Sequence, residues 1–346
     1  MRKFISIFLC VLMIATSMLF VGCSKEPADA NTESDVNASA ENVKFGLGLY
    51  NAVSKATDAD GEVNGQGEIA ITAAAVMLDA DGKIVKCVID TADNTVDYTA
   101  DGKAISAESF LTKYELGDNY NMKLYGGATK EWYEQVDAFS ALVVGKTADE
   151  VKALVAEGNK GTEEVVNAGC TIMIADFVYA LDAAISNAVD SVAVADNELK
   201  LGMYTEQTTK DATEDADGQN KLETTVFAAA VDADGKIVAS TNDCVQVVFT
   251  FDQKGASTYD TTADVVSKKV KGEAYGMSLY GTDLNGDGEV KEWFEQSAAF
   301  DAVCAGKTAG DVEELLTDNN YGSEELQSAG CTILVNGLVK AAAKIG

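Results

Sequence analysis

The sequence has 346 residues, of which 26 are Lys or Arg and 56 are Asp or Glu, so its formal charge is -30 at pH 7, and it contains no histidine. Nucleic acid is excluded as a partner, because a protein that binds phosphate backbones needs a basic surface. Catalytic centres of the Ser-His-Asp or Cys-His kind are excluded as well, because histidine is their general base.

The chain begins with a segment typical of an export signal. Two basic residues precede an apolar stretch at 4–20, which is interrupted by serine and threonine and is too short for the roughly 20 apolar residues of a membrane span. The Val-Gly-Cys run that ends at Cys23 resembles the bacterial lipobox. This resemblance implies a lipoprotein signal peptide at 1–22, a lipid on Cys23 and a membrane anchor on the outer face of the cytoplasmic membrane, at the bacterial cell surface. An ordinary signal peptide with a chance cysteine is the alternative.

Residues 23–42 are expected to form a lipid-anchored flexible tether. They are polar and acidic, hold the only proline and lack any apolar period. About 300 residues follow, which is enough for two domains of ordinary size. This part contains five of the seven cysteines, so at least one stays free unless it pairs between chains.

The sequence after the tether contains a long internal repeat. The run Asp-Ala-Asp-Gly-Lys-Ile-Val begins at Asp79 and again at Asp232, and the run Ala-Gly-Cys-Thr-Ile begins at Ala168 and again at Ala329. These spacings far exceed the roughly 20 to 50 residues of a solenoid unit. They indicate a duplicated domain.

Each copy is predicted to open with β-strands. Apolar runs at 69–78 and 84–89 flank an Asp-Gly turn, which is the signal of a β-hairpin. In the second copy apolar residues alternate with their neighbours from Val245 to Phe251, which predicts a strand with one buried face.

Helices are predicted to follow the strands in each copy. Thr147 with Glu150 reads as a capping box at a helix start, and Thr308 with Asp311 repeats it. Apolar residues at helical spacing mark two further helices in each copy: Trp132, Val136, Phe139 and Val143, then Ile174, Phe177, Val178 and Leu181; in the second copy Trp293, Phe300 and Cys304, then Val335, Leu338, Val339 and Ala342. The predicted fold class is α+β, with two copies of one domain at 43–190 and 191–346, each an antiparallel sheet followed by packed helices.

The most distinctive repeated residues are Gly169 and Thr171 in one copy and Gly330 and Thr332 in the other. They lie just ahead of the last predicted helix, where free backbone N–H groups and the positive helix end can seat a phosphate. This order of elements resembles the FMN-binding domain family of exported bacterial flavoproteins, in which a Ser-Gly-Ala-Thr run precedes the final helix and its threonine can carry FMN through a phosphoester bond. The resemblance implies FMN at these four residues, a flavin transferase and redox partners, and an extracytoplasmic electron carrier.

A second interpretation of the same residues needs no flavin. Thr171 and Thr332 are then helix N-caps, worth about 1 kcal/mol each, and the cysteines at 170 and 331 fill a tight contact between helix and sheet. The protein is then a noncatalytic surface lipoprotein that binds a ligand or another surface component.

Four more side chains bear on this choice. Lys130 or Lys291 could assist backbone amides in holding a phosphate. Trp132 and Trp293 could stack on an isoalloxazine ring, although their helical spacing favours the core.

An insertion in the second copy resembles the first eight positions of an EF-hand or dockerin-type calcium loop. Asp283, Asn285, Asp287 and Glu289 supply the oxygen ligands that Ca²⁺ prefers. The twelfth position is Phe294 in place of a bidentate glutamate. A weak Ca²⁺ site and a plain turn are equal alternatives here, because the same residues form turns without a metal.

Overall fold

The computed structural model describes residues 41–280, 288 and 290–346 of the chain. Cys23 and the expected signal peptide lie outside the described residues, as do the expected calcium ligands Asp283, Asn285, Asp287 and Glu289. The described residues belong to one compact unit, Ala40–Gly346. Within that part of the chain, no helix has both the length and the apolar character needed to cross a bilayer.

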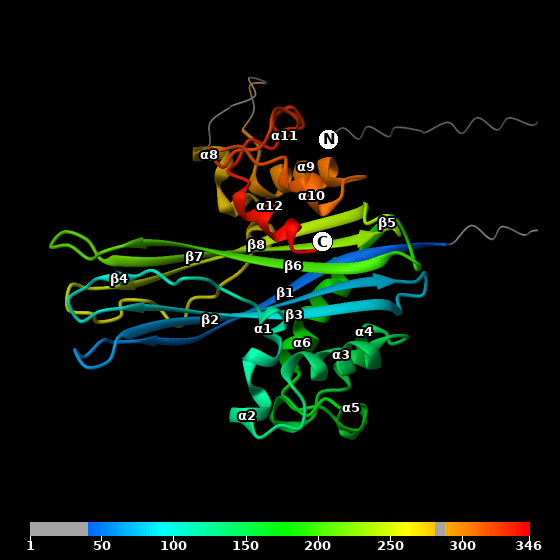
Figure 1. The fold of residues 1–346 in the computed structure, drawn as a ribbon, viewed down its shortest axis with the longest axis horizontal. Coiled ribbons are helices and arrows are strands. Elements are labelled where there is room, and N and C mark those ends of the chain that lie inside the picture. Colours follow the sequence, from blue (N-terminus) through cyan, green and yellow to red (C-terminus); the bar gives the residue numbers. More distant parts are fainter. Residues whose placement is uncertain (1–40, 281–287, 289) are drawn as a thin grey trace, which may run out of the picture. The chain divides into compact units, whose positions relative to one another are not determined.

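The N-terminal half contains a five-stranded antiparallel sheet in the order β4-β3-β2-β1-β5 (Figure 1). Its strands are β1 (Asn42–Thr57), β2 (Gly65–Leu78), β3 (Ile84–Tyr98), β4 (Ala104–Ile105) and β5 (Val189–Val194). The predicted hairpin is β2 with β3, and its turn is fixed by Asp79, whose Oδ1 accepts hydrogen bonds from the backbone N–H groups of Asp81 and Lys83. The boundary expected between residues 190 and 191 falls within β5, which pairs with β1.

The helices of this half follow its first four strands. They are α1 (Lys113–Leu116), α2 (Met122–Gly126), α3 (Trp132–Val143), α4 (Ala148–Lys152), α5 (Glu163–Ala168) and α6 (Ala175–Ser186), with 3-10 turns at Gly117–Tyr120 and Glu157–Asn159. The predicted apolar face of α3 is buried, and the capping box of Thr147 and Glu150 begins α4 as predicted.

The C-terminal half repeats this order with a three-stranded antiparallel sheet, β6-β7-β8. Its elements are β6 (Glu198–Lys210), β7 (Gly218–Val231), β8 (Ile237–Phe251), α7 (Lys268–Lys271), a 3-10 turn at Gly272–Tyr275, α8 (Met277–Tyr280), α9 (Trp293–Cys304), α10 (Ala309–Glu313), α11 (Glu324–Ser328) and α12 (Asn336–Ala343). The capping box of Thr308 and Asp311 begins α10 as predicted. The fold is therefore mixed α+β with antiparallel sheets, as the sequence predicts at this level.

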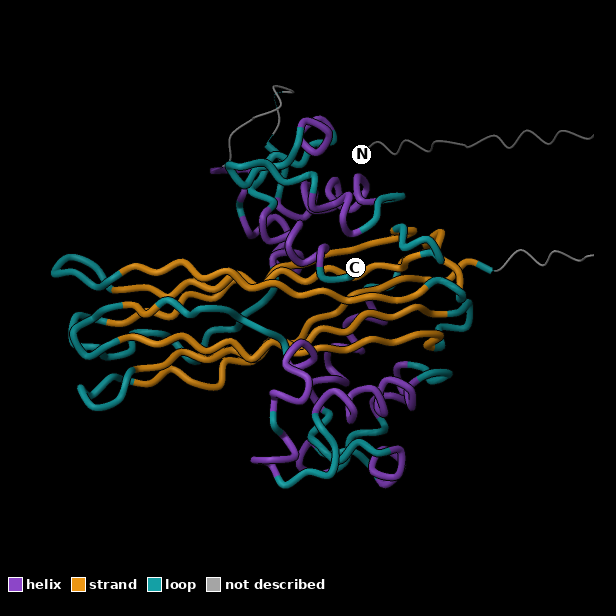
Figure 2. The backbone as a smooth tube through the Cα atoms, viewed as in Figure 1, coloured by secondary structure: helices purple, strands orange, loops and turns teal. Residues whose placement is uncertain are grey.

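The two sheets pack face to face, and the helices cover their outer faces (Figures 1 and 2). Along β7, Val226, Ala228 and Ala230 face the other sheet, whereas Phe227 and Ala229 face the helices. Burial on both faces explains why this part of the strand is continuously apolar, since alternation is expected only where one face meets water. At the other end of β7, beyond the helices, buried and more exposed residues do alternate from Gly218 to Glu223.

Polar side chains also cross the contact between the sheets, and Asn94 makes a fully buried example. The Asn94 Nδ2 group on β3 donates to the hydroxyl of Thr205 at 3.2 Å and to that of Thr224 at 3.0 Å. The two threonine hydroxyls are also 2.9 Å apart. Because a buried amide needs specific partners, this contact favours one alignment of the two sheets.

Helix α6 lies directly on β1, and the sequence permits this through glycine. A Cβ atom added at Gly48 would lie 2.1 Å from the backbone N of Ala184, and one at Gly46 would lie 2.2 Å from the Ala184 carbonyl oxygen. Any side chain at these two positions would therefore push the helix off the sheet.

We expect Gly48→Ala to lower the free energy of unfolding by about 3 kcal/mol, because the added methyl group clashes with backbone atoms that cannot rotate away. Urea denaturation followed by circular dichroism measures this change. Gly310→Ala in α10 is the control, since its added Cβ meets nothing closer than 3.9 Å, and alanine is the better helix former. Equal stabilities of the two variants would contradict the close approach of α6 to β1.

Candidate functional site

The repeated Ala-Gly-Cys-Thr-Ile runs lie in the loops that lead into α6 and α12. Helix α6 begins at Ala175 after the N-cap Ile174, and α12 begins at Asn336 after the N-cap Val335. Neither cap has a side-chain hydrogen bond, because both are aliphatic. The interpretation of Thr171 and Thr332 as N-caps is therefore wrong.

The glycine of each run lies at the end of the preceding helix in the left-handed region, where a side chain would be strained. Gly169 has φ 107° and is the C-cap of α5, and Gly330 has φ 95° directly after α11. A Cβ at Gly169 would lie 2.3 Å from Lys130 Nζ, and one at Gly330 would lie 2.6 Å from Lys291 Nζ. A lysine ammonium group therefore lies against each glycine.

Each threonine is held by a buried glutamine. Gln135 Oε1 on α3 accepts from the Thr171 N–H at 2.8 Å and from its Oγ1 at 2.9 Å. Gln296 Oε1 on α9 accepts from the Thr332 N–H at 2.8 Å and from its Oγ1 at 3.0 Å. The amide nitrogen of each glutamine donates to the lysine carbonyl that precedes its helix, at 3.2 and 3.0 Å.

Each half also has a buried glutamate that precedes its glutamine in the chain. This glutamate accepts a hydrogen bond from the first backbone amide of a short helix, α2 or α8. Glu131 Oε2 accepts from the Met122 N–H at 2.8 Å, and Glu292 Oε2 accepts from the Met277 N–H at 2.9 Å. The hydrogen bond from the Ser278 hydroxyl is the largest of the effects that keep the pKa of Glu292 below its usual range. The anionic carboxylates thus satisfy the first amides of α2 and α8.

The cysteines of the two runs are packing residues, as the second interpretation predicts. Both Cys170 and Cys331 are fully buried, and burial raises the pKa of their thiols to about 11 and about 12. Cys304 is also fully buried. The five cysteines in the described part of the chain are all free thiols.

A pocket of about 460 Å³, here called the C-terminal pocket, adjoins Thr332 and Gln296. The strands β6, β7 and β8 supply its polar groups Glu206, Lys221, Glu223, Thr225 and Gln246, together with Cys244. The surrounding helices and loops supply Lys268, Tyr275, Met277, Val290, Trp293, Tyr321, Ile333, Leu334, Gly337 and Leu338. The structure thus places Thr332 and Trp293 at one pocket.

Three charged groups of this pocket, Lys221, Glu223 and Lys268, are paired with one another. Lys268, with 8% of its side chain exposed, forms an ion pair with Glu223 at 2.8 Å, and Lys221 pairs with the same carboxylate at 2.5 Å. Lys268 Nζ also lies 5.2 Å from the Tyr275 ring and 5.4 Å from the Trp293 ring. Burial by itself would lower the pKa of Lys268. Its neighbours, which include Glu223, together have the larger effect, so the pKa of Lys268 is raised. The ammonium group is therefore charged.

The N-terminus of α12, where a phosphate was expected, already has a carboxylate beside it. Glu206 Oε1 accepts a hydrogen bond from the Asn336 side chain. A Cβ added at Gly337 would lie 3.3 Å from Glu206 Oε2. A negative charge from the protein itself therefore lies at the positive end of this helix, where a phosphate would be repelled.

The matching positions in the N-terminal half are filled differently. Asp176 and Phe177 of α6 replace Gly337 and Leu338 of α12. The buried Phe177 ring packs edge to face on Trp132, with 5.9 Å between ring centroids. Burial is the main cause that raises the pKa of Asp176. A carboxylate thus lies in the first turn of α6, and an aromatic ring occupies the position of Leu338.

The comparisons with known proteins assign no family. No protein-family model, curated protein or solved structure matches this chain. In the described part of the chain, no group of three or more His, Cys, Asp or Glu side chains is arranged to hold a metal ion.

Sequence analysis missed the two glutamines. Gln135 and Gln296 each follow a repeated tryptophan by three residues, within the matching runs Lys-Glu-Trp-Tyr-Glu-Gln and Lys-Glu-Trp-Phe-Glu-Gln. This repeated run was the available signal. The sequence could not show that each glutamine bonds to a threonine of the repeated motif, because the two residues are 36 positions apart.

We expect Gln296→Ala to lower the free energy of unfolding by about 2 kcal/mol, because it leaves the Thr332 N–H without an acceptor. Thr332→Ala removes only a hydroxyl group and should cost about 1 kcal/mol. Urea denaturation of both variants measures the difference. The proposed role of the glutamine would be wrong if the two losses were equal.

Proposed function

We propose that this chain is an exported bacterial lipoprotein, anchored at the cell surface through a lipid on Cys23, that binds a small ligand without catalysing a reaction. The basic and apolar N-terminus followed by Val-Gly-Cys supports export and lipidation. The charge of -30 and the lack of histidine support a role other than nucleic-acid binding or hydrolysis.

We also propose that the described part consists of two copies of one domain. The same order of strands and helices in both halves supports this. So do the matching hydrogen bonds of Gln135 with Thr171 and of Gln296 with Thr332. On this proposal the motif persists in both copies because it joins the α5–α6 loop to α3 and the α11–α12 loop to α9. In the C-terminal copy a pocket adjoins the motif.

The observation that carries the binding proposal is the composition of the C-terminal pocket. Trp293, Tyr275 and Tyr321 supply aromatic surface, and Gln246, Gln296 and Thr332 supply hydrogen-bonding groups. Its volume of about 460 Å³ lies within the range of small-molecule sites, about 300–1,000 Å³. These groups favour a flat aromatic ligand with polar atoms along its edge.

The same pocket lacks the features of a reactive site. Its thiol, Cys244, is buried, and burial raises its pKa to about 11, so the reactive thiolate is scarce at neutral pH. Its carboxylate Glu223 is paired with two lysines, which oppose its desolvation and hold its pKa below the usual range. Binding is therefore better supported than catalysis.

A flavin electron carrier is the second candidate, and the place of Thr332 at the pocket favours it. An isoalloxazine ring is flat and has polar edges, as this pocket requires. The phosphate of FMN fits less well. The Thr332 hydroxyl already donates to Gln296, and the Glu206 carboxylate lies at the N-terminus of α12. Near Thr171, the Asp176 carboxylate would repel the FMN phosphate, and the Phe177 ring packs on Trp132 at the position of Leu338. Both features count against FMN there.

Titration of the chain from Ser24 onward with riboflavin and with FMN tests these proposals. We expect riboflavin fluorescence to be quenched with a Kd at least tenfold below that for FMN, because the FMN phosphate meets Glu206. Glu206→Gln should reduce the difference between the two Kd values, because it removes the negative charge that the FMN phosphate meets. Leu338→Phe, which introduces the aromatic residue of the first copy, should abolish quenching, whereas Phe177→Leu in the first copy should not reduce it.

The outcomes separate the two candidates. A fluorescent band on a denaturing gel, from a host with a flavin transferase, would support the electron carrier, provided that Thr171→Ala with Thr332→Ala removes it. A protein that quenches neither flavin and shows no such band would exclude flavin as the ligand. A melting-temperature screen with other flat aromatic molecules would then test the pocket itself.

A further inference from the structure

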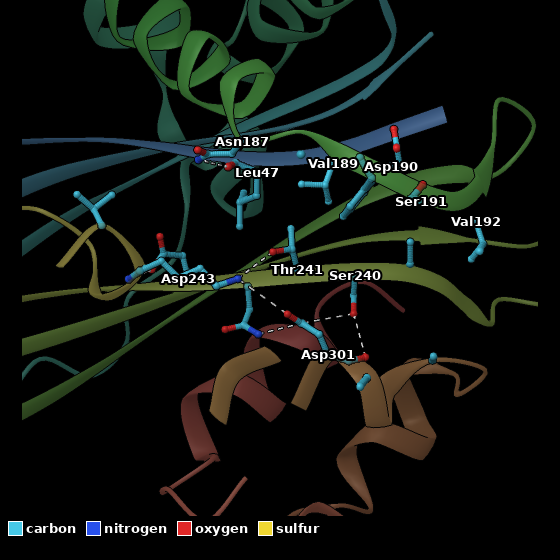
Figure 3. Close-up of a pocket in the computed structure, with 18 residues that line it drawn as sticks. Leu47, Asn187, Val189, Asp190, Ser191, Val192, Ser240, Thr241, Asp243 and Asp301 are labelled. Atoms are coloured by element: carbon cyan, nitrogen blue, oxygen red, sulfur yellow. Dashed lines mark hydrogen bonds and ion pairs between the residues drawn. The ribbon is translucent and has the colours of Figure 1, made fainter. Parts of the chain in front are cut away.

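A second cavity, of about 890 Å³, lies between the two sheets near one end of their contact (Figure 3). Strands β1 and β5 contribute one wall, which includes Leu47 and Val189. Strand β8 and the helices α7 and α9 contribute the other wall, which includes Lys269 and Asp301. This cavity, here called the inter-sheet cavity, shares no lining residue with the C-terminal pocket.

The inter-sheet cavity contains a mostly buried carboxylate, Asp301, whose ion-pair partner Lys269 lies at the long distance of 4.0 Å. Asp301 accepts from Asn242 Nδ2 at 2.9 Å and from Ser240 Oγ at 3.3 Å, and its side chain is only 14% exposed. The Lys269 ammonium lies 4.0 Å from Asp301 Oδ2 and donates instead to Thr241 Oγ1 at 2.9 Å. Burial outweighs these neighbours and raises the pKa of Asp301 to about 6.

A second acceptor lies beside this carboxylate. Asn242 is fully buried and lines the cavity. Its amide nitrogen donates to Asp301 and to the Ser297 carbonyl, but its Oδ1 has no hydrogen-bond donor among the described residues. A buried acceptor without a donor is unfavourable by about 1–3 kcal/mol, and a ligand N–H group would remove that cost.

The N-terminal half shows that the fold does not need these groups. The positions that match Asp301, Asn242 and Lys269 hold Ser140, Ile89 and Tyr114. At these positions the strand and helix of the N-terminal half therefore pack without a carboxylate. A buried carboxylate is unfavourable for folding unless a cation pairs closely with it, and the Lys269 ammonium is 4.0 Å away, so a closer cation from a ligand would stabilise Asp301.

The rest of the cavity wall defines the shape of that ligand. Phe45, Leu47, Val189, Val192 and Val270 supply apolar surface. The titratable lining groups are Asp190, Asp243 and Asp301 against the single cation Lys269. Asp243 is already engaged by the N–H groups of Cys244 and Lys269. The excess of negative charge, within a chain of formal charge -30, attracts cations.

We propose that the inter-sheet cavity binds an amphipathic primary amine, with its ammonium group between Asp301 and Asn242 Oδ1 and its apolar body against β1 and β5. The ammonium group supplies a closer cation for Asp301 than Lys269 at 4.0 Å, and the donor that Asn242 Oδ1 lacks. This site is separate from the C-terminal pocket, and the proposal does not depend on whether that pocket binds a flavin.

Isothermal titration with three probes of equal chain length tests the proposal: hexylamine, hexanol and hexanoate, at pH 7.5 and 0.15 M salt. We expect hexylamine to bind at least tenfold more tightly than hexanol, and hexanoate to bind least. Asp301→Ser, which introduces the residue of the N-terminal half, should weaken hexylamine binding at least tenfold. Asn242→Ile should weaken it by a smaller factor.

The control is Ser140→Ala, at the matching position outside the cavity, which should leave hexylamine binding unchanged. Equal binding of hexylamine and hexanol, absence of hexylamine binding, or full binding to Asp301→Ser would each overturn the proposal. Circular dichroism confirms that each variant is folded, and Asp301→Asn replaces Asp301→Ser if the latter is not.

The pH dependence of stability checks the state of the carboxyl group in the free protein. The pKa of Asp301 in the folded chain, about 6, exceeds that of an unfolded aspartate, about 3.9. The folded state therefore binds the proton more tightly, so this group's contribution to stability is present below about pH 4 and is lost as the pH rises through 6. Relative to Asp301→Asn, the native protein should become less stable between pH 4.5 and 7.5. A constant difference would mean that Asp301 is solvated, which contradicts the proposed site.

Discussion

The apolar contact between the two sheets is the constraint on which the rest of the molecule depends. Because the sheets cover each other's inner faces and the helices cover the outer faces, the second halves of β2 and β7, at 71–78 and 224–231, are buried throughout. Small residues make this possible. Alanines at 73–75 and 228–230 keep the layers close, and Gly46 and Gly48 let the backbone of α6 approach β1. Both pockets lie where this layered packing is incomplete.

A second level of organisation is polar and joins the helices to one another. In both halves one helix bears a buried glutamate, which satisfies the start of the preceding short helix, and a buried glutamine, which holds the threonine of the following loop. Buried polar groups of this kind are tolerated when their hydrogen bonds are made. These hydrogen bonds are a sufficient reason for the repeated residues. Whether the protein binds a ligand therefore depends on the residues around the motif.

The functional contrast that we propose between the halves depends on a few differences at matching positions. Phe177 places a ring where Leu338 leaves space, and Asp301 places a carboxylate where Ser140 places a hydroxyl group. One change bears on a pocket for a flat ligand, and the other creates a charged cavity. Neither alters the backbone hydrogen bonds of the strands, so each could arise without loss of the fold.

The sequence by itself determined the features that depend on neighbouring residues. The Asp79 turn, the buried face of α3 and the capping boxes at Thr147 and Thr308 all follow from local hydrogen bonds or from periodicity. The acidic composition led us to expect no nucleic-acid partner, and the lack of histidine excludes catalysis by a histidine base. The start of α6 was misplaced, because Thr171 has the residue type of a cap but donates its hydroxyl to Gln135 instead.

Only the tertiary structure decided what surrounds the repeated motif. The contact of Gln296 with Thr332, the ion pairs of Glu223 and the position of Asp301 join residues far apart in the chain. The partners of such side chains are set by how the sheets and helices pack, which periodicity cannot specify. Cavities depend on the same packing, since a single side chain such as Phe177 decides whether space remains. The sequence therefore predicted where the distinctive residues are, and packing decided which of them adjoin a pocket.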